Sequence, residues 1–174
     1  GYSSTDYYDR SVNNYSIDLR WTSNNELGRT RGFNWVTGIY RFVREVDLER
    51  DYTWFEVPYV SKFDVSRSAL YGQGTFSLSD RLSFSTGLRL EGHDSKFIDS
   101  FDVRFSPQDS LLGGKAVLEM LASENSRFHA SISKGYKSGG FNTSGSLDEP
   151  LRLFEPEILL SLIHISEPTR RNSI

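Results

Sequence analysis

Two neighbouring runs of alternating apolar and polar residues, joined by a two-residue turn, most constrain what this chain can fold into. Within residues 65–78, apolar residues and glycines occupy every second position: Leu70, Gly72, Gly74, Phe76 and Leu78. Ser79 and Asp80 supply turn chemistry, and the alternation resumes over residues 81–91. Successive side chains of a strand point to opposite faces, so the pattern predicts an antiparallel hairpin with one apolar and one polar face.

Further strands are predicted on both sides of this hairpin. Residues 15–21 alternate throughout, and residues 111–121 and 127–133 alternate around a polar turn at 122–126. Residues 33–43 are rich in aromatic and β-branched types, which indicates a strand without defining its faces. Twelve Phe, nine Tyr, three Trp and 14 Gly also favour strands and turns. The predicted fold is all-β, antiparallel and up-and-down, with about six to seven strands.

The predicted connections alternate in length. Short ones (24–32, 79–80 and 122–126) alternate with long ones (44–64, 92–110 and 138–155). In an up-and-down sheet, alternate connections lie at the same end. Short turns at one end and long loops at the other are typical of outer-membrane barrels, so the pattern favours a transmembrane barrel. A soluble β-sandwich that binds glycans is the alternative, because hydrophobic pattern alone does not distinguish lipid from protein as the apolar neighbour.

Composition narrows the possible partners. The net charge is −3 and the Lys and Arg residues are scattered, so nucleic acid is not an expected partner. There is no cysteine and no run of 18 apolar residues. The sequence starts without an initiator Met or a signal peptide, and we expect it to be a piece of a longer protein.

Acidic residues and one histidine gather after the predicted hairpin, in the order Glu91, His93, Asp94, Asp99 and Asp102. Their spacing follows no metal-ligand signature, and a solvated acidic loop is the favoured interpretation. No nucleophile elbow, phosphate-binding loop or zinc-type His motif is present. We therefore expect no enzyme activity, no catalytic residue, no metal site and no cofactor.

An ordered set of short motifs resembles the barrel of TonB-dependent outer-membrane receptors. The set comprises Tyr71-Gly72-Gln73, Asp80-Arg81-Leu82, Gly87-Leu88-Arg89-Leu90-Glu91, Gly114-Lys115, Ser131 to Ser133 followed by Lys134-Gly135-Tyr136-Lys137-Ser138-Gly139-Gly140-Phe141-Asn142, and Phe154 to Glu157. Residues 17–20 and 35–40 are weaker matches. The resemblance covers about residues 15–158, and its specificity comes from the order and spacing of the motifs.

The resemblance implies a 22-stranded barrel in the outer membrane of a Gram-negative bacterium, surrounded by lipid and enclosing a plug domain. Such receptors import scarce large solutes with energy from the TonB–ExbB–ExbD complex. Ferric siderophores are the commonest class, with cobalamin, other metal chelates and oligosaccharides open. A passive porin-like barrel is a further alternative. Six strands cannot close this barrel, so residues 1–159 are expected to be part of it, with the plug outside this sequence.

Four residues are candidate ligand contacts: Tyr136, Lys137, Phe141 and Asn142. Structural use at a strand-to-loop junction is the favoured role for this motif, with Gly135, Gly139 and Gly140 permitting bends. In a barrel, a set of charged side chains would line the lumen: Asp18, Arg20, Arg89, Glu91 and Lys115. A set of aromatic side chains would face outward, where girdles form: Tyr15, Trp21, Phe84 and Phe128.

The last residues depart from the family pattern. After Phe154 to Glu157 the resemblance implies another strand with an aromatic-Glu-x-Gly-x-Lys element, but residues 160–170 read LSLIHISEPTR. This segment resembles the translation of a sequencing-library adapter, and we expect residues 160–174 to be a non-native tail. The alternative is a genuine edge strand, since Leu162, Ile163 and Ile165 have β propensity.

Overall fold

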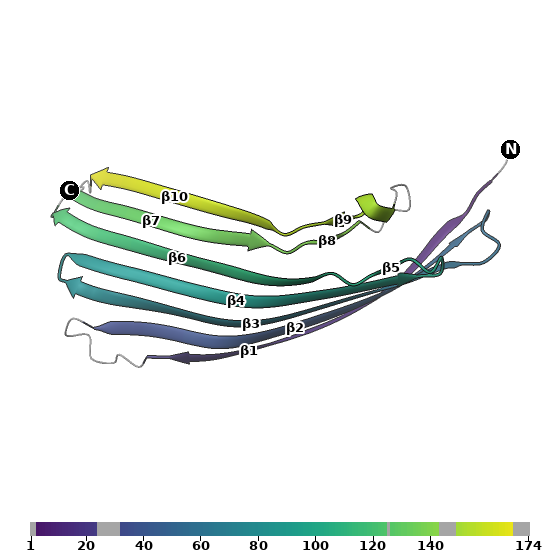
Figure 1. Cartoon of the computed structure of the whole chain (residues 1–174), viewed down its shortest axis with the longest axis horizontal. Coiled ribbons are helices and arrows are strands. Elements are labelled where there is room, and N and C mark those ends of the chain that lie inside the picture. The colour runs from purple at the N-terminus through teal and green to yellow at the C-terminus, as the bar shows by residue number, and fades with distance from the viewer. Residues whose placement is uncertain (1–2, 24–31, 125, 143–148, 169–174) are drawn as a thin grey trace, which may run out of the picture.

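The main sheet of the protein is antiparallel, and its strands follow one another in chain order (Figure 1). The computed structural model describes residues 3–23, 32–124, 126–142 and 149–168. The order across the sheet is β1-β2-β3-β4-β6-β7-β10, with β5 paired to β4. The strands are β1 (Asp6–Thr22), β2 (Phe33–Tyr52), β3 (Tyr59–Ser79), β4 (Leu82–Asp99), β5 (Arg104–Phe105), β6 (Gln108–Ser123), β7 (Ser126–Lys137) and β10 (Glu157–Pro168). The all-β, up-and-down prediction is confirmed, and the sheet stays open because β1 and β10 lie at opposite edges.

One face of the sheet carries an apolar row that crosses five strands. Leu19, Ile39, Leu70, Leu90 and Leu112 are successive direct partners from β1 to β6. Directly opposite residues share a face, so all five side chains point the same way. Leu70 and Leu90 are each 55% exposed, and nothing in the described part of the chain covers them. The predicted apolar face of the hairpin is confirmed.

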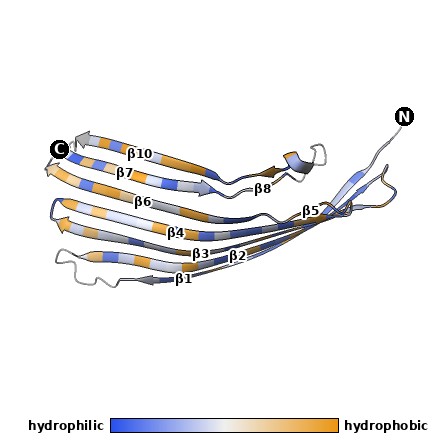
Figure 2. Ribbon diagram, viewed as in Figure 1, coloured by the Kyte–Doolittle hydropathy of each residue, from blue (hydrophilic) through white to orange (hydrophobic). Residues whose placement is uncertain are grey.

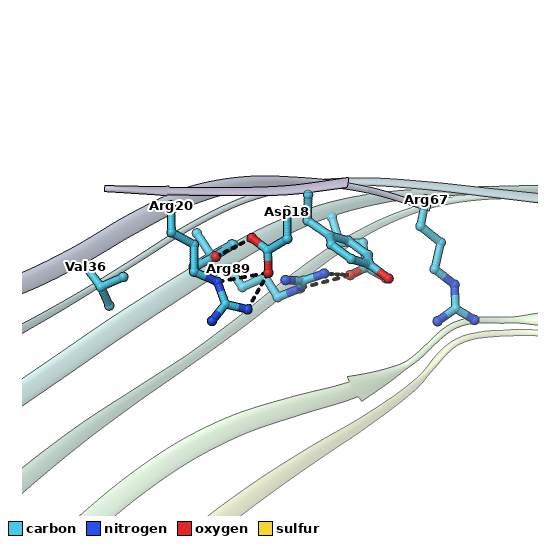
Figure 3. Close-up of a pocket in the computed structure, with 8 residues that line it drawn as sticks. Asp18, Arg20, Val36, Arg67 and Arg89 are labelled. Carbon is cyan, nitrogen blue, oxygen red and sulfur yellow. Dashed lines mark hydrogen bonds and ion pairs between the residues drawn. The ribbon is translucent and has the colours of Figure 1, made fainter. Parts of the chain in front are cut away.

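The other face is concave and holds the buried side chains. The sheet curls so that β1 and β7 lie on opposite sides of the cluster drawn in Figure 3. On β2, β3, β4 and β6 the buried apolar residues all belong to this face: Val46, Val65, Ala69, Phe97 and Leu111. We call this side the concave face and the side with the apolar row the convex face.

The strands run further than the sequence pattern predicted, and two expected long loops are wrong. β2 continues to Tyr52 and β3 begins at Tyr59, so only residues 53–58 connect them. Likewise β4 continues to Asp99 and β6 begins at Gln108. Apolar and polar residues alternate along the strands (Figure 2). In the extensions their faces are exchanged: Val46 and Phe97 are buried on the concave face, whereas Asp47 and Lys96 are exposed on the convex face. Most of the expected connection 24–32 lies outside the described residues.

The inversion has a simple physical reason. Along β3 the apolar convex positions run from Leu70 to Leu78, the length of about 9 to 11 residues that a transmembrane strand needs. Beyond Leu70 the convex positions are Ser68, Ser66, Asp64 and Lys62. Polar side chains there require water outside the sheet, while the apolar side chains turn inward to pack. We call residues 70–78 of β3 and their neighbours the apolar band.

The segment after β7 folds back as a small hairpin. β8 (Gly140–Phe141) pairs with β9 (Leu153–Phe154), and η1 (Glu149–Leu151) precedes β9. β10 then pairs with β7 from Glu157 to Pro168, so residues 160–168 of the expected tail lie as an edge strand. Residues 169–174 lie outside the described part. Among the described residues no helix is long and apolar enough to cross a membrane.

Candidate functional site on the concave face

Charged and tyrosine side chains from several strands meet on the concave face. The Tyr71 hydroxyl donates a hydrogen bond of 2.7 Å to Asp18 Oδ1, which crosses from β3 over β2 to β1. Arg20 donates through Nε to Asp18 Oδ2 at 2.9 Å and forms an ion pair with the same carboxylate. Asp18, Arg20 and Tyr71 thus form one connected group.

Arg89 is the centre of a second group. Its Nη2 lies 2.6 Å and its Nε 2.9 Å from Glu91 Oε2. Its guanidinium carbon lies 5.3 Å from the ring centre of Tyr40 and 5.8 Å from that of Tyr71, distances that permit cation–π attraction. The Tyr136 hydroxyl lies 3.2 Å from Arg89 Nε and 3.3 Å from Glu91 Oε2. The Glu91 side chain is only 8% exposed, so Arg89 is the cation that neutralises it.

Two glycines make room for these tyrosines. A Cβ atom at Gly38 would lie 2.5 Å from the Tyr71 hydroxyl oxygen and 2.7 Å from the Leu19 carbonyl oxygen. A Cβ atom at Gly113 would lie 2.8 Å from Cε1 of Tyr136. Each ring therefore covers a glycine on the neighbouring strand, an arrangement that fills the gap left by the missing side chain. Only glycine allows either approach without displacement of the ring.

The alternation of β7 changes face before Tyr136. Ser131 and Ser133 pair with Val117 and Lys115, and Lys115 shares the concave face with Gly87. Strict alternation from Ser133 would put Tyr136 on the convex face. Its hydroxyl instead contacts Arg89 and Glu91 on the concave face. Among the described residues, the pairing of β7 with β6 ends at Lys134, which allows this change.

Residues of both groups, among them Asp18, Tyr71, Arg89 and Glu91, line a cavity of about 480 Å³. Figure 3 shows Asp18, Arg20 and Arg67 projecting from the sheet into the space on its concave side. Arg67 donates through Nε to Nδ1 of His93 at 3.1 Å, and its guanidinium carbon lies 6.0 Å from the Phe42 ring centre. His93 is 5% exposed and lies beyond the apolar band; burial, and then the charge of Arg67, lower its pKa. The cavity is suited to polar and charged contacts.

The end of the motif enters an aromatic cluster. The Phe141 ring centre lies 5.3 Å from Phe63, 5.1 Å from Phe97 and 5.3 Å from Phe105. Arg152 is 5% exposed, lies over the Phe105 ring at 5.2 Å and donates through Nε to the Asn142 carbonyl oxygen at 2.8 Å. These contacts hold the β8–β9 hairpin against the concave face.

The four candidate ligand contacts therefore lie in different surroundings. Tyr136 belongs to the Arg89 group and Phe141 to the aromatic cluster, while the Asn142 backbone pairs with Arg152. Lys137 is exposed, with Nζ 3.4 Å from Glu157 Oε1. The candidates do not form a single site. The strand-to-loop junction is found where the motif predicted it, because β7 ends at Lys137.

Two glycines of the motif, Gly139 and Gly140, are closely packed, whereas a Cβ atom at Gly135 would meet no atom of the described residues within 4 Å. No described glycine has a positive φ, so Gly135, Gly139 and Gly140 do not adopt the left-handed backbone conformation that favours glycine. A Cβ atom at Gly139 would lie 2.7 Å from the Phe154 carbonyl oxygen, and one at Gly140 would lie 2.9 Å from the Phe154 ring. The Gly139 N–H also donates to Asp109 Oδ2 at 3.0 Å. Ser138 lies between β7 and β8.

The remaining motif and outward-facing residues keep their predicted faces. Gln73, Gly87 and Lys115 are successive partners on the concave face, whereas Gly72 lies on the convex face. The convex face also carries the outward aromatic residues Tyr15, Trp21, Phe84 and Phe128. Phe84 stacks with Phe76, whose ring stacks in turn with Phe33.

The acidic stretch after the hairpin is mostly strand. Glu91 and His93 face the concave side, whereas Asp94 faces the convex side. Asp99 accepts backbone hydrogen bonds from Phe101 and Val103. Among the described residues there is no group of three or more His, Cys, Asp or Glu arranged to hold a metal ion. The predicted solvated acidic loop is wrong for residues 91–99, which belong to β4.

Sequence reasoning missed several residues of this face. Tyr40 and Arg67 were not singled out, because the faces of residues 33–43 were unclear and residue 67 lies in a polar stretch. Phe63 and Phe97 fell in expected loops. The alternation of the hairpin at residues 70–90, continued in both strands beyond Leu70 and Leu90, would have placed Phe63, Arg67 and Phe97 on the concave side.

Comparisons with known proteins agree on one fold. A family model described as "TonB dependent receptor-like, beta-barrel" matches residues 1–158. The ferric yersiniabactin uptake receptor FyuA from Yersinia pestis matches with a TM-score of 0.71 and 18% identity, over 95% of this chain and 27% of that one. The ferric citrate transporter FecA, in its unliganded form, matches with a TM-score of 0.64 and 11% identity, over 76% and 22%. No curated protein gives a significant match.

At these identities the two structures show a shared fold. This chain spans about a quarter of the length of either solved receptor. The family match covers most of the chain, including both halves of the Arg89 group. The chain belongs to the TonB-dependent receptor-like β-barrel family.

Proposed function

We propose that this chain is part of the barrel wall of an outer-membrane receptor of a Gram-negative bacterium. The whole receptor would bind a ferric siderophore, or another scarce large solute, at its extracellular side. Uptake would be driven by the TonB–ExbB–ExbD complex through a plug domain, and the solute would pass without covalent change. The family match supports this class of function.

The inverted hydrophobic pattern is the observation that carries the proposal. In the apolar band the convex side chains are apolar and the concave ones charged or polar, as in Leu90 and Arg89. Beyond the band, the convex side chains are charged and the concave ones apolar, as in Lys96 and Phe97. A soluble sandwich has water along the whole outer face, so it gives no reason for the switch. A lipid layer of limited height explains it.

The strand extensions indicate which end faces the cell exterior. Outer-membrane barrels have short periplasmic turns and longer extracellular parts. Here Ser79 and Asp80 form the short turn between β3 and β4, at the end of the sheet that we propose to be periplasmic. The extensions, the aromatic cluster and the β8–β9 hairpin lie at the other end, which we propose to be extracellular. The two solved structures named above are a ferric yersiniabactin uptake receptor and a ferric citrate transporter, which supports an iron chelate as the solute class.

The four motif candidates remain proposals for ligand contact. We propose that Tyr136 and Phe141 contribute first to the shape of the concave wall, because both rings pack against other residues of the wall. Lys137 and Asn142 lie where the chain leaves β7.

We also propose that residues 1–159 are the barrel region and that residues 160–174 are a non-native tail. The sequence of the genomic locus would test this division.

Fractionation and uptake measurements on the full-length receptor test the proposed function. We expect the receptor in the outer membrane after a high-salt wash, and uptake of radiolabelled ferric chelate that stops when TonB is deleted. Recovery in the soluble periplasm would support a binding module instead. Uptake that continues without TonB would support a passive porin.

A further inference from the structure

Three arginines on the concave face of neighbouring strands β1, β2 and β3 have no carboxylate partner among the described residues. They are Arg10 on β1, Arg44 on β2 and Arg67 on β3, and we call them the arginine ladder. Their partners in the register place them on one face: Arg10 opposite Leu48, Arg44 opposite Val65, and Arg67 opposite His93. At about 3.3 Å per residue, the six positions between the levels of Arg10 and Arg67 span about 20 Å along the strands.

The other concave-face arginines of β1 to β4 differ from the ladder. Arg20 pairs with Asp18, Arg50 with Asp6, and Arg89 with Glu91. The two remaining carboxylates near the ladder have partners of another kind: Asp99 accepts from two backbone N–H groups, and Asp109 accepts from the Gly139 N–H. None of the three ladder arginines therefore forms an ion pair with a carboxylate of the described chain.

Arg44 has a buried nitrogen without a hydrogen-bond acceptor in the described part of the chain. Its Nε atom is enclosed by the protein and has no hydrogen-bond partner among the described residues. A buried donor without an acceptor costs about 1–3 kcal/mol. Arg67 uses Nε for the neutral Nδ1 of His93, and the described residues provide no hydrogen-bond acceptor for its terminal nitrogens. Guanidinium groups of this kind are suited to carboxylate, phenolate or phosphate oxygens.

The ladder connects two cavities. Arg10 borders a cavity of about 490 Å³ at the extracellular end, together with the rings of Tyr8, Tyr59, Phe63 and Phe97. Arg67 borders the cavity of about 480 Å³ that contains the Arg89 group. Arg44 lies at a level between them. The outer cavity thus offers aromatic walls and one unpaired cation, with further cations toward the second cavity.

We propose that the arginine ladder is a binding strip for an anionic iron chelate with aromatic oxygen ligands, a catecholate or phenolate. This inference rests on the proposed function and names the solute class within it. The aromatic rings of such a chelate stack on the walls of the outer cavity, and its negative charge is attracted by Arg10, Arg44 and Arg67. A neutral hydroxamate chelate gains nothing from the same charges.

Binding to outer membranes that contain the full-length receptor tests the strip. The probes are a ferric tris-catecholate, which is anionic, and a ferric tris-hydroxamate, which is neutral. For the wild type we expect tighter binding of the anionic probe and a Kd that rises with salt. We expect each single variant Arg10→Gln, Arg44→Gln and Arg67→Gln to weaken anionic-probe binding by about tenfold, as expected for loss of a charge-assisted hydrogen bond.

The matched control is Arg41→Gln, which removes the same charge three residues from Arg44. Arg41 lies on the convex face, where it donates to Ser68 Oγ, and we expect its variant to bind both probes as the wild type does. The heat-dependent gel mobility of each variant reports whether the barrel is folded. An Arg44→Lys variant keeps the positive charge and should recover part of the affinity for the anionic probe that Arg44→Gln loses.

The outcomes separate the two proposals. If the wild type takes up only the neutral probe, or if the ladder variants leave anionic-probe binding unchanged, the ladder proposal is overturned and the proposed function stands. If the ladder variants weaken binding of both probes equally or prevent folding while Arg41→Gln does not, the ladder serves the receptor's own interior and the proposal is likewise overturned. If the wild type binds neither probe, the ladder proposal is overturned, whereas the proposed function is decided separately by outer-membrane fractionation and by the dependence of uptake on TonB.

Discussion

Single residues on the concave face act through fit as well as charge. Tyr71 reaches Asp18 two strands away because Gly38, on the strand between, has no side chain. Tyr136 reaches Arg89 because Gly113 has none. In both cases a tyrosine and a glycine on adjacent strands form a unit. The tyrosine hydroxyl is hydrogen-bonded to a charged side chain on the strand beyond the glycine. The motif residues Tyr71, Arg89 and Tyr136 therefore have a common structural task.

Substitution of Gly38 tests this fit. In the full-length receptor, we expect Gly38→Ala to displace the Tyr71 ring and to lower the free energy of unfolding by about 1–3 kcal/mol, as overpacking does. Urea unfolding in lipid vesicles, followed by tryptophan fluorescence, measures the change. Gly72→Ala is the control, because a Cβ atom there would meet its nearest neighbour at an ordinary 3.6 Å. Equal destabilisation by both substitutions would contradict the role given to the Tyr71 ring.

At the scale of elements, the β8–β9 hairpin depends on Phe141 and Arg152 for its position. Phe141 contacts rings from β3, β4 and β5, and Arg152 covers one of them. The hairpin itself has only two residue pairs with β-ladder geometry. Side-chain packing, more than backbone pairing, therefore fixes this segment to the wall.

Removal of the Phe141 ring should release the segment while the barrel stays folded. We expect Phe141→Ala to cost about 3 kcal/mol locally and to expose residues 138–156 to external protease in intact cells. Mass spectrometry of the released peptides locates the cleavage. Phe101→Ala, which truncates a ring that is 71% exposed, serves as the control and should leave the segment protected. An unchanged cleavage pattern for Phe141→Ala would show that the ring does not hold the hairpin.

The far ends of β1 and β2 are joined by a pH-sensitive pair. Asp6 and Arg50 lie well beyond the apolar band, with Arg50 Nη2 2.8 Å from Asp6 Oδ2. The hydrogen bond from Arg50 lowers the pKa of Asp6 from 3.8. A lowered folded-state pKa means that the stabilisation is present above the ordinary value and is lost as the pH falls through the folded-state value.

Hydrogen exchange at the ends of β1 and β2 measures this loss. We expect faster opening of amides near Tyr8 and Arg50 once the pH falls below about 3.8, relative to amides at the middle of the same strands. Asp6→Asn should remove this pH dependence. If the variant keeps the same acid response, another group is responsible.

At the scale of the whole molecule, the two faces exchange hydrophobic character along each strand. The hairpin of β3 and β4 and its two faces could be predicted because lipid and lumen impose opposite demands on alternate positions between Leu70 and Leu90. The extensions were missed because Glu45, Asp47 and Lys62 are charged as a loop would be, and only their concave neighbours are apolar. The face of Tyr136 could not be predicted, since it depends on a local break in the β7 alternation.

A charge placed on the convex face tests the depth of the apolar band. Leu118 lies on this face opposite Phe84, whereas Ser110 lies on the same face of the same strand, opposite Gly92 and beyond the band. We expect Leu118→Arg to destabilise the full-length receptor by about 2–4 kcal/mol and to reduce its amount in the outer membrane. Ser110→Arg should have little effect. Equal effects in vesicle unfolding would place the band elsewhere.

The fit of Tyr71 over Gly38 also bears on how the strands find their alignment. If β3 slipped against β2 by two positions, every apolar side chain would still point to the lipid, so hydrophobic burial scarcely opposes such an error. In the slipped arrangement, the Tyr71 ring would meet Val36 or Tyr40 in place of Gly38. The tyrosine–glycine unit thus discriminates between alignments that the membrane itself treats as equivalent, and it does so across three strands with one side chain.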